Sequence, residues 1–181
     1  MYQESKKPQT KNLKTNWNRT DVPSDWSPGQ IIKHFTKATP VDVVGIAEAL
    51  GVRVWEMHSL AENTAGLIFR DPINGGPSGY SIGINASDPY NRKRFTVAHE
   101  VAHFLLHRNK ITKELKDDRM YRSGLSGQAE EQANRLAADI LMPRNLIREL
   151  ISSGITNPDD MASKLEVSPL AMRIRLGIPV I

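Results

Sequence analysis

The motif His-Glu-Val-Ala-His at residues 99–103 constrains this chain more than any other part of its sequence. It lies inside an apolar-rich run, 94–106, whose spacing predicts a helix. On a helix, residues four positions apart share one face and lie about 6 Å apart along the axis. His99 and His103 can therefore bind one metal ion, and Glu100 beside them can take a proton from an attacking water and pass it to a leaving amine. The alternative is a helix whose two histidines face solvent or pack in a core.

A third metal ligand has to come from elsewhere in the chain. His107 continues the four-residue spacing of His99 and His103. In a straight helix His107 lies about 12 Å from His99 along the axis, whereas zinc binds nitrogen at about 2.1 Å. The three histidines therefore cannot share one ion, and we expect His107 to be a helix-end or packing residue.

A second helix is predicted downstream, in the segment 126–143, with Ser126 as its N-cap. Five residues of this segment fall on one face at helical spacing: Glu130, Ala133, Asn134, Ala137 and Leu141. The small residues on this face allow another helix to approach closely. We therefore predict that Glu130 is the carboxylate ligand directed at His99 and His103. Asn134, one turn later, can hydrogen-bond a ligand imidazole from behind.

Glu131 is the competing carboxylate. It lies about 100° further round the helix, together with Arg135. This position is typical of an ion pair on a solvated face, so we prefer Glu130. The alternative for Glu130 itself is an ordinary surface glutamate in a first helical turn, where the helix dipole favours a negative charge.

Taken together, these residues resemble the ImmA/IrrE family of metallo-endopeptidases. The segment 94–107 looks like the zinc helix of that family, 130–143 like its second signature, which supplies the third ligand, and 167–176 like its C-terminal segment. The likeness runs from about Pro40 to the C-terminus. One departure is Leu136, where the family usually carries Phe, and this change concerns packing alone. The resemblance implies a small cytoplasmic bacterial protease, often paired with a helix-turn-helix repressor that it cleaves or inactivates.

We expect an α+β fold, in which a small sheet packs with the zincin-like helix and further C-terminal helices. Strands are predicted at 52–56, 66–70 and 80–85. An extended substrate could lie along an edge strand of such a sheet, within 66–85. The expected organisation is a flexible tail (1–28), a zincin-like core (29–143) and a C-terminal helical segment (144–181). The tail has a net charge of +4 over its first 20 residues, which accounts for the whole net charge of +4 of the chain.

The C-terminal segment has the outline of a helix-turn-helix, because Asn157-Pro158 and Ser168-Pro169 are both helix-start signals. A DNA reader would carry basic and amide side chains along its second helix. Only Arg173 and Arg175 are present there. We therefore expect packing against the core rather than direct DNA binding.

Composition excludes several other kinds of function. The absence of cysteine excludes disulfides, thiolate zinc sites and a cysteine nucleophile. No apolar run approaches the roughly 18 residues that a membrane span needs, and the N-terminus shows no secretory apolar region. Gly75-Gly76 lies in a turn-like stretch that lacks the lysine of a phosphate-binding loop. These features fit a cytoplasmic protein without a membrane partner.

The leading hypothesis is a zinc-dependent endopeptidase that binds one zinc ion per chain through His99, His103 and Glu130, with Glu100 as the catalytic base. Its substrate would be one partner protein, a co-encoded repressor or antitoxin with a helix-turn-helix. The alternative is a non-enzymatic regulator that inactivates a repressor by binding it. Manganese or iron would also suit the ligands. Candidate oxyanion donors are Tyr80, Tyr90 and Tyr121, and the connection 108–127 is either a lid or an ordinary surface loop.

Overall fold

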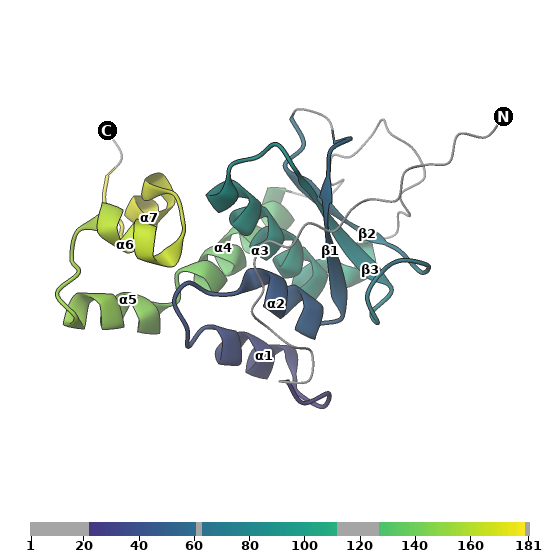
Figure 1. Ribbon diagram of the computed structural model, residues 1–181, viewed down its shortest axis with the longest axis horizontal. Coiled ribbons are helices and arrows are strands. Elements are labelled where there is room, and N and C mark those ends of the chain that lie inside the picture. The colour runs from purple at the N-terminus through teal and green to yellow at the C-terminus, as the bar shows by residue number, and fades with distance from the viewer. Residues whose placement is uncertain (1–21, 61–62, 112–126, 180–181) are drawn as a thin grey trace.

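The computed structural model describes residues 22–60, 63–111 and 127–179. Figure 1 shows a sheet on one side, two long helices beside it, and a group of shorter helices towards the C-terminus. This arrangement confirms the α+β class. The helices are α1 (Pro28–Phe35), α2 (Val43–Ala49), α3 (Tyr90–His107), the short 3₁₀ helix η2 (Arg108–Lys110), α4 (Gly127–Leu141), α5 (Arg144–Ser152), α6 (Pro158–Leu165) and α7 (Pro169–Arg175).

Three strands form the sheet of the described residues: β1 (Val52–Met57), β2 (Gly66–Arg70) and β3 (Tyr80–Asn85). Their order is β1-β3-β2, with β1 parallel and β2 antiparallel to β3. The central strand β3, which lies between β1 and β2, is buried along its whole length. The strand predicted at 52–56 is one residue longer, and the other two have the predicted limits.

The register of β2 leaves the backbone groups of alternate residues facing away from the sheet. Asn85 donates to the carbonyl of Ala65 and Asp71 donates to the carbonyl of Gly79, both at 2.8 Å. In an antiparallel ladder such hydrogen-bonded pairs alternate along the strand. The residues whose peptide groups point away from β3 are therefore Gly66, Ile68 and Arg70. In the described part of the chain no other strand pairs with this edge.

Helix α3 packs against the sheet and is longer than the predicted 94–106, since it begins at Tyr90 after Pro89. Gly66 allows β2 to lie close to this helix. A Cβ atom at Gly66 would collide with the side chain of Thr96 on α3 and with the carbonyl oxygen of Gly83 on β3. Only glycine fits at this contact, which sets the distance between the free edge of the sheet and the helix.

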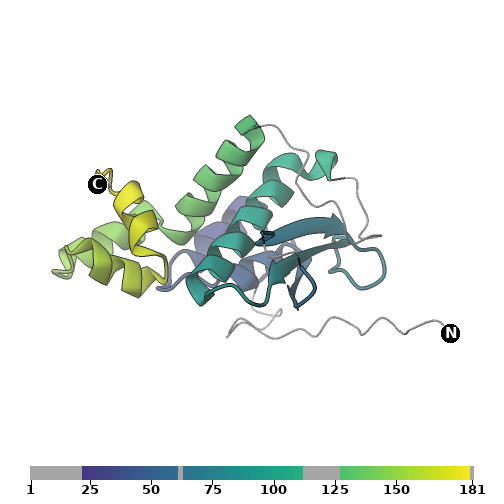
Figure 2. The same cartoon turned by 90° about the horizontal axis from the view of Figure 1, so that it is seen from above.

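Helix α4 lies alongside α3, as Figures 1 and 2 show. Ala129, Ala133 and Ala137 form a buried stripe on α4, and the last two are fully buried. A stripe of alanines places the two helix axes close together, as the sequence pattern suggested. The predicted N-cap Ser126 lies outside the described residues.

The segment before α1 is attached to the body. Ser27 caps α1 in a capping box with Gln30. Val22 and Trp26 are partly buried against the core, and the Trp26 ring meets His34 edge-on at 5.3 Å. Trp26 therefore lies on the folded body, while residues 1–21 of the predicted tail lie outside the described residues.

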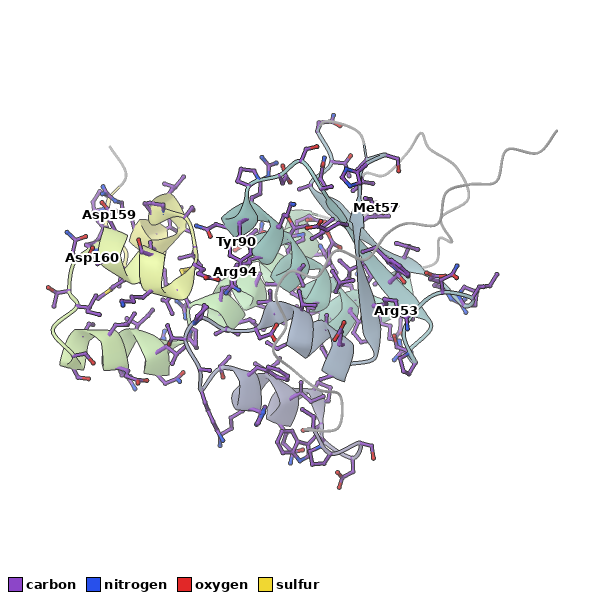
Figure 3. The ribbon with its side chains drawn as sticks, viewed as in Figure 1. Arg53, Met57, Tyr90, Arg94, Asp159 and Asp160 are labelled. Carbon is purple, nitrogen blue, oxygen red and sulfur yellow. The ribbon has the colours of Figure 1, made fainter. Side chains whose placement is uncertain are left out.

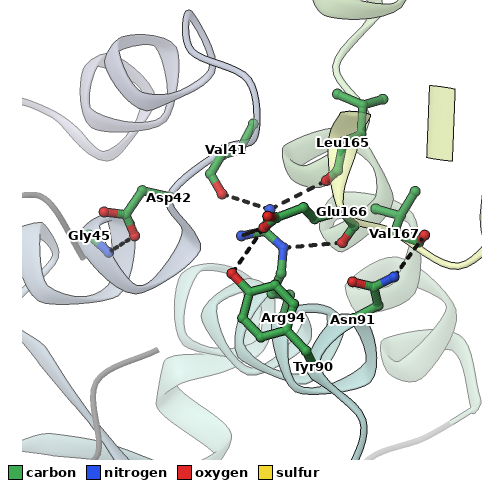
Figure 4. A network of polar contacts seen from close by, with 9 residues as sticks. All are labelled: Val41, Asp42, Gly45, Tyr90, Asn91, Arg94, Leu165, Glu166 and Val167. Atoms are coloured by element: carbon green, nitrogen blue, oxygen red, sulfur yellow. Dashed lines mark hydrogen bonds and ion pairs between the residues drawn. The ribbon is translucent and has the colours of Figure 1, made fainter. Parts of the chain in front are cut away.

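A buried arginine connects α3 to the C-terminal helices. Arg94 donates hydrogen bonds to the carbonyls of Val41 (2.8 Å), Leu165 (3.4 Å) and Glu166 (3.2 Å), as Figure 4 shows. Its guanidinium also lies 3.4 Å from the Glu166 carboxylate, which accepts a hydrogen bond from the Tyr90 hydroxyl. Figure 3 shows Tyr90 and Arg94 at the end of α3 nearest to α6 and α7. One cation thus joins three separate segments of the chain.

Candidate metal centre

Two histidines of α3 face each other across one helical turn. The Nε2 atoms of His99 and His103 lie 2.9 Å apart. His103 is buried, and His99 is partly exposed. The four-residue spacing places both side chains on one face of the helix and directs both rings to one point.

Helix α4 brings a carboxylate to the same point. Glu130 Oε2 lies 3.3 Å from His99 Nε2, and Glu130 Oε1 lies 3.5 Å from His103 Nε2. The ligand atoms of His99, His103 and Glu130 all lie within 4.8 Å of one another. Glu131, the competing candidate, is exposed and pairs with Arg135 at 3.0 Å. The structure thus brings together the three residues predicted as ligands and leaves Glu131 on the solvated face.

Asn134 lies behind the first histidine. Its Oδ1 is 2.9 Å from His99 Nδ1. An amide oxygen only accepts, so His99 Nδ1 carries the proton and donates it. The Nε2 atom of His99 then keeps its lone pair on the side of His103 and Glu130. This contact is the one expected for Asn134 from its place one turn after Glu130.

Glu100 is buried between α3 and β2, and it accepts a hydrogen bond from the outward-facing backbone N–H of Ile68. The pKa of the Glu100 carboxyl is raised from 4.5 to about 8, chiefly by burial and also by the negative charge of Glu130, while the Ile68 hydrogen bond opposes the rise. Burial also lowers the pKa of His103 from 6.5 to about 4, assisted by His99. Both shifts favour uncharged side chains as long as no cation lies among them.

His107 and Gln132 form a contact that was not predicted from the sequence. His107 Nδ1 lies 3.3 Å from His103 Nδ1, and His107 Nε2 lies 3.1 Å from Gln132 Oε1. His107 was expected at a helix end or in packing, and it is buried at the last turn of α3. A helical wheel of α4 could have indicated this role for Gln132. It places Gln132 beside the alanine stripe that faces α3, on the side opposite to Glu130 and Asn134.

Two of the three tyrosines proposed as oxyanion donors have other contacts. Tyr80 is buried with its ring against Phe104 at 5.4 Å. The Tyr90 hydroxyl donates to Glu166 at the far end of α3. Tyr121 lies outside the described residues, as does most of the predicted lid.

The chemistry of the donor set fits a divalent metal ion. Two imidazole nitrogens and one carboxylate oxygen are the ligands of many catalytic zinc sites, in which three protein groups leave a further position open. Two nitrogens bound tetrahedrally at about 2.1 Å would lie about 3.4 Å apart, close to the 2.9 Å between the two Nε2 atoms. Small outward movements of the two rings would open the centre for an ion.

Comparison with known proteins gives a match over most of the chain. Residues 47–177 match the profile of the M78 peptidases, described as the IrrE N-terminal-like domain. A solved structure titled Mycobacterium tuberculosis transcriptional regulator is similar in fold, with a TM-score of 0.54 and 14% sequence identity. The likeness covers 83% of this chain and 46% of that one, so this chain spans less than half of that protein. No curated protein matches the sequence. Within the described residues, no helix has both the length and the apolar character to cross a membrane.

Proposed function

The chain belongs to the M78 peptidase family, and on that premise we propose that it is a zinc-dependent endopeptidase that cleaves one partner protein. The observation that carries the proposal is the convergence of His99, His103 and Glu130 beside the buried carboxyl of Glu100. This combination supplies both a metal site and a proton acceptor next to it. A partner of the kind proposed below is intracellular, so the proposal places the enzyme in the cytoplasm.

His99, His103 and Glu130 would hold the ion, and Glu100 would move the proton. When bound, a divalent ion acts as a Lewis acid that polarises the carbonyl of the scissile peptide bond. A cation near Glu100 also favours its ionised form and lowers its raised pKa. The Glu100 carboxylate then takes a proton from the attacking water and delivers it to the nitrogen of the leaving amine.

The free edge of β2 suits an extended peptide substrate. The peptide groups of Gly66, Ile68 and Arg70 point away from β3, and one of them, the N–H of Ile68, lies against Glu100. A substrate strand that paired with this edge would pass next to the proton acceptor. In this arrangement backbone hydrogen bonds hold the substrate, and the Ile68 N–H exchanges its carboxylate acceptor for a substrate carbonyl.

We propose a helix-turn-helix repressor or antitoxin as the substrate, as the likeness to the ImmA/IrrE proteases implies. Direct DNA binding finds no support in α7. Its two basic side chains are engaged within the chain, since Arg173 lies 3.1 Å from Asp159 and Arg175 lies 2.7 Å from Asp139. The proposal therefore assigns any effect on transcription to the partner protein.

Glu100→Gln tests this proposal. The assay uses a helix-turn-helix protein from a neighbouring gene as the test substrate, incubated with zinc-loaded wild-type protein, with the variant, and with Glu131→Gln as the matched control. We expect cleavage by the wild type and by Glu131→Gln, and none by Glu100→Gln. If Glu100→Gln still releases the repressor from DNA without cleavage, the protein is a binding regulator and the endopeptidase proposal is wrong.

A further inference from the structure

A chain of hydrogen-bonding groups runs from the surface to the rear of one proposed ligand. It begins at the exposed Gln132, passes through the buried ring of His107, and ends at Nδ1 of the buried His103. The opposite nitrogen of His103, Nε2, faces His99 and Glu130. Whether His103 Nδ1 carries the proton therefore determines whether His103 Nε2 has a lone pair for a metal ion.

The direction of the chain follows from donor and acceptor chemistry. Gln132 Oε1 only accepts, so His107 Nε2 carries a proton. In a neutral His107 the Nδ1 atom is then an acceptor, and it accepts a hydrogen bond from His103 Nδ1–H. His103 Nε2 consequently has a free lone pair. With the opposite direction, His103 Nε2 would carry the proton and could not bind a metal ion.

We propose that His107 and Gln132 are positioning residues that hold His103 in its metal-binding tautomer. Asn134 does the same for His99 from the other flank of α4. Together these contacts leave both Nε2 atoms, which lie 2.9 Å apart, available to bind one cation. The inference rests on the proposed function only in that His103 is a ligand.

The structure explains why the chain of contacts has this form. Four-residue spacing on α3 places His107 one turn after His103, and the close approach of α4 brings Gln132 within reach of the outer ring. A carboxylate or backbone carbonyl usually accepts the second proton of a ligand histidine. Here His107 is the acceptor for His103, and the Gln132 amide is in turn the acceptor for His107.

Gln132→Leu removes the acceptor from an exposed position and leaves the buried core intact. Gln128→Leu, one turn earlier and also exposed, is the matched control. Gln132→Glu keeps an acceptor in place and serves as the conservative rescue. Zinc affinity is measured by competition with a chromogenic chelator. We expect Gln132→Leu to bind zinc about 10- to 100-fold more weakly, and Gln128→Leu and Gln132→Glu to bind as the wild type does.

A spectroscopic readout separates tautomer control from simple packing. Long-range ¹H–¹⁵N spectra of metal-free protein should show His103 protonated at Nδ1 in the wild type and in Gln132→Glu. Gln132→Leu should show a mixture of tautomers. The inference is wrong if the wild-type spectrum shows the proton on Nε2, or if Gln132→Leu binds zinc as tightly as Gln128→Leu. Zinc binding that weakens as expected without any proteolysis would overturn the proposed function and support this inference.

Discussion

The backbone N–H of Ile68 donates a hydrogen bond to the carboxyl group of Glu100 and so joins the free edge of the sheet to α3. Ile68 can make this contact because the register of β2 turns its peptide group away from β3. The close packing at Gly66 brings the strand near enough to the helix. The outward edge of β2 and the carboxyl group of Glu100 therefore lie next to each other.

Removing the Ile68 N–H should impair substrate binding without affecting the metal site. Ile68→Pro lacks this donor, while the ladder to β3, which does not use it, can persist. We expect peptide cleavage by Ile68→Pro to fall at least about tenfold, the value of a lost hydrogen bond of roughly 1.4 kcal/mol, at unchanged zinc content. Ile68→Val keeps the N–H and should retain activity. Full cleavage by Ile68→Pro would show that substrates bind elsewhere.

Arg94 should matter more for stability than any exposed arginine. Arg94→Leu would leave the carbonyls of Val41 and Leu165 and the Glu166 carboxylate without their cation. A buried acceptor that loses its hydrogen-bond donor costs about 1–3 kcal/mol, and Arg94 serves two such carbonyls, so the expected loss is about 3 kcal/mol. Urea denaturation should show a loss of this size.

The matched control for that experiment is Arg135→Leu. The Arg135 side chain is 74% exposed and pairs with Glu131, 71% exposed, one turn away. Exposed pairs contribute at most about 1 kcal/mol. Equal losses in the two variants would contradict the assignment of Arg94 as the anchor of the C-terminal helices.

The metal-free protein should lose stability as the pH rises from 6.5 to 8. The pKa of Glu100 is raised from 4.5 to about 8 in the folded state, so the folded state binds more protons than the unfolded state between these values. Stability then falls with rising pH by about 1.4 kcal/mol per pH unit. The pKa of His103, lowered from 6.5 to about 4, gives the opposite slope below pH 6.5. The net fall therefore appears between pH 6.5 and 8.

Glu100→Gln isolates this effect, because glutamine does not titrate and His103 is retained. Urea denaturation of metal-free protein at several pH values should give a slope for the wild type that is absent in the variant between pH 6.5 and 8. Identical pH profiles for both proteins would mean that Glu100 is already ionised in the folded state.

The sequence predicted those parts of the site that depend on one helix or on one helical face. The spacing of His99 and His103 needs only the geometry of α3, and Glu130 follows from the alanine stripe of α4. The strand limits were also readable, because turn residues bound each strand. Gln132 was missed because its contact with His107 depends on the position of α4 along the axis of α3, which the sequence does not give. The outward face of Ile68 was missed because it depends on strand register, which periodicity does not give.

The metal content of the purified protein tests the central claim most directly. We expect about one zinc ion per chain in the wild type and in Glu131→Ala, and a lost or strongly weakened site in Glu130→Ala. Glu130 and Glu131 are neighbours on α4, so the two variants differ in whether the carboxylate faces His99 and His103. Full zinc content in Glu130→Ala, or none in wild-type protein incubated with excess zinc, would contradict the claim that His99, His103 and Glu130 form a metal centre.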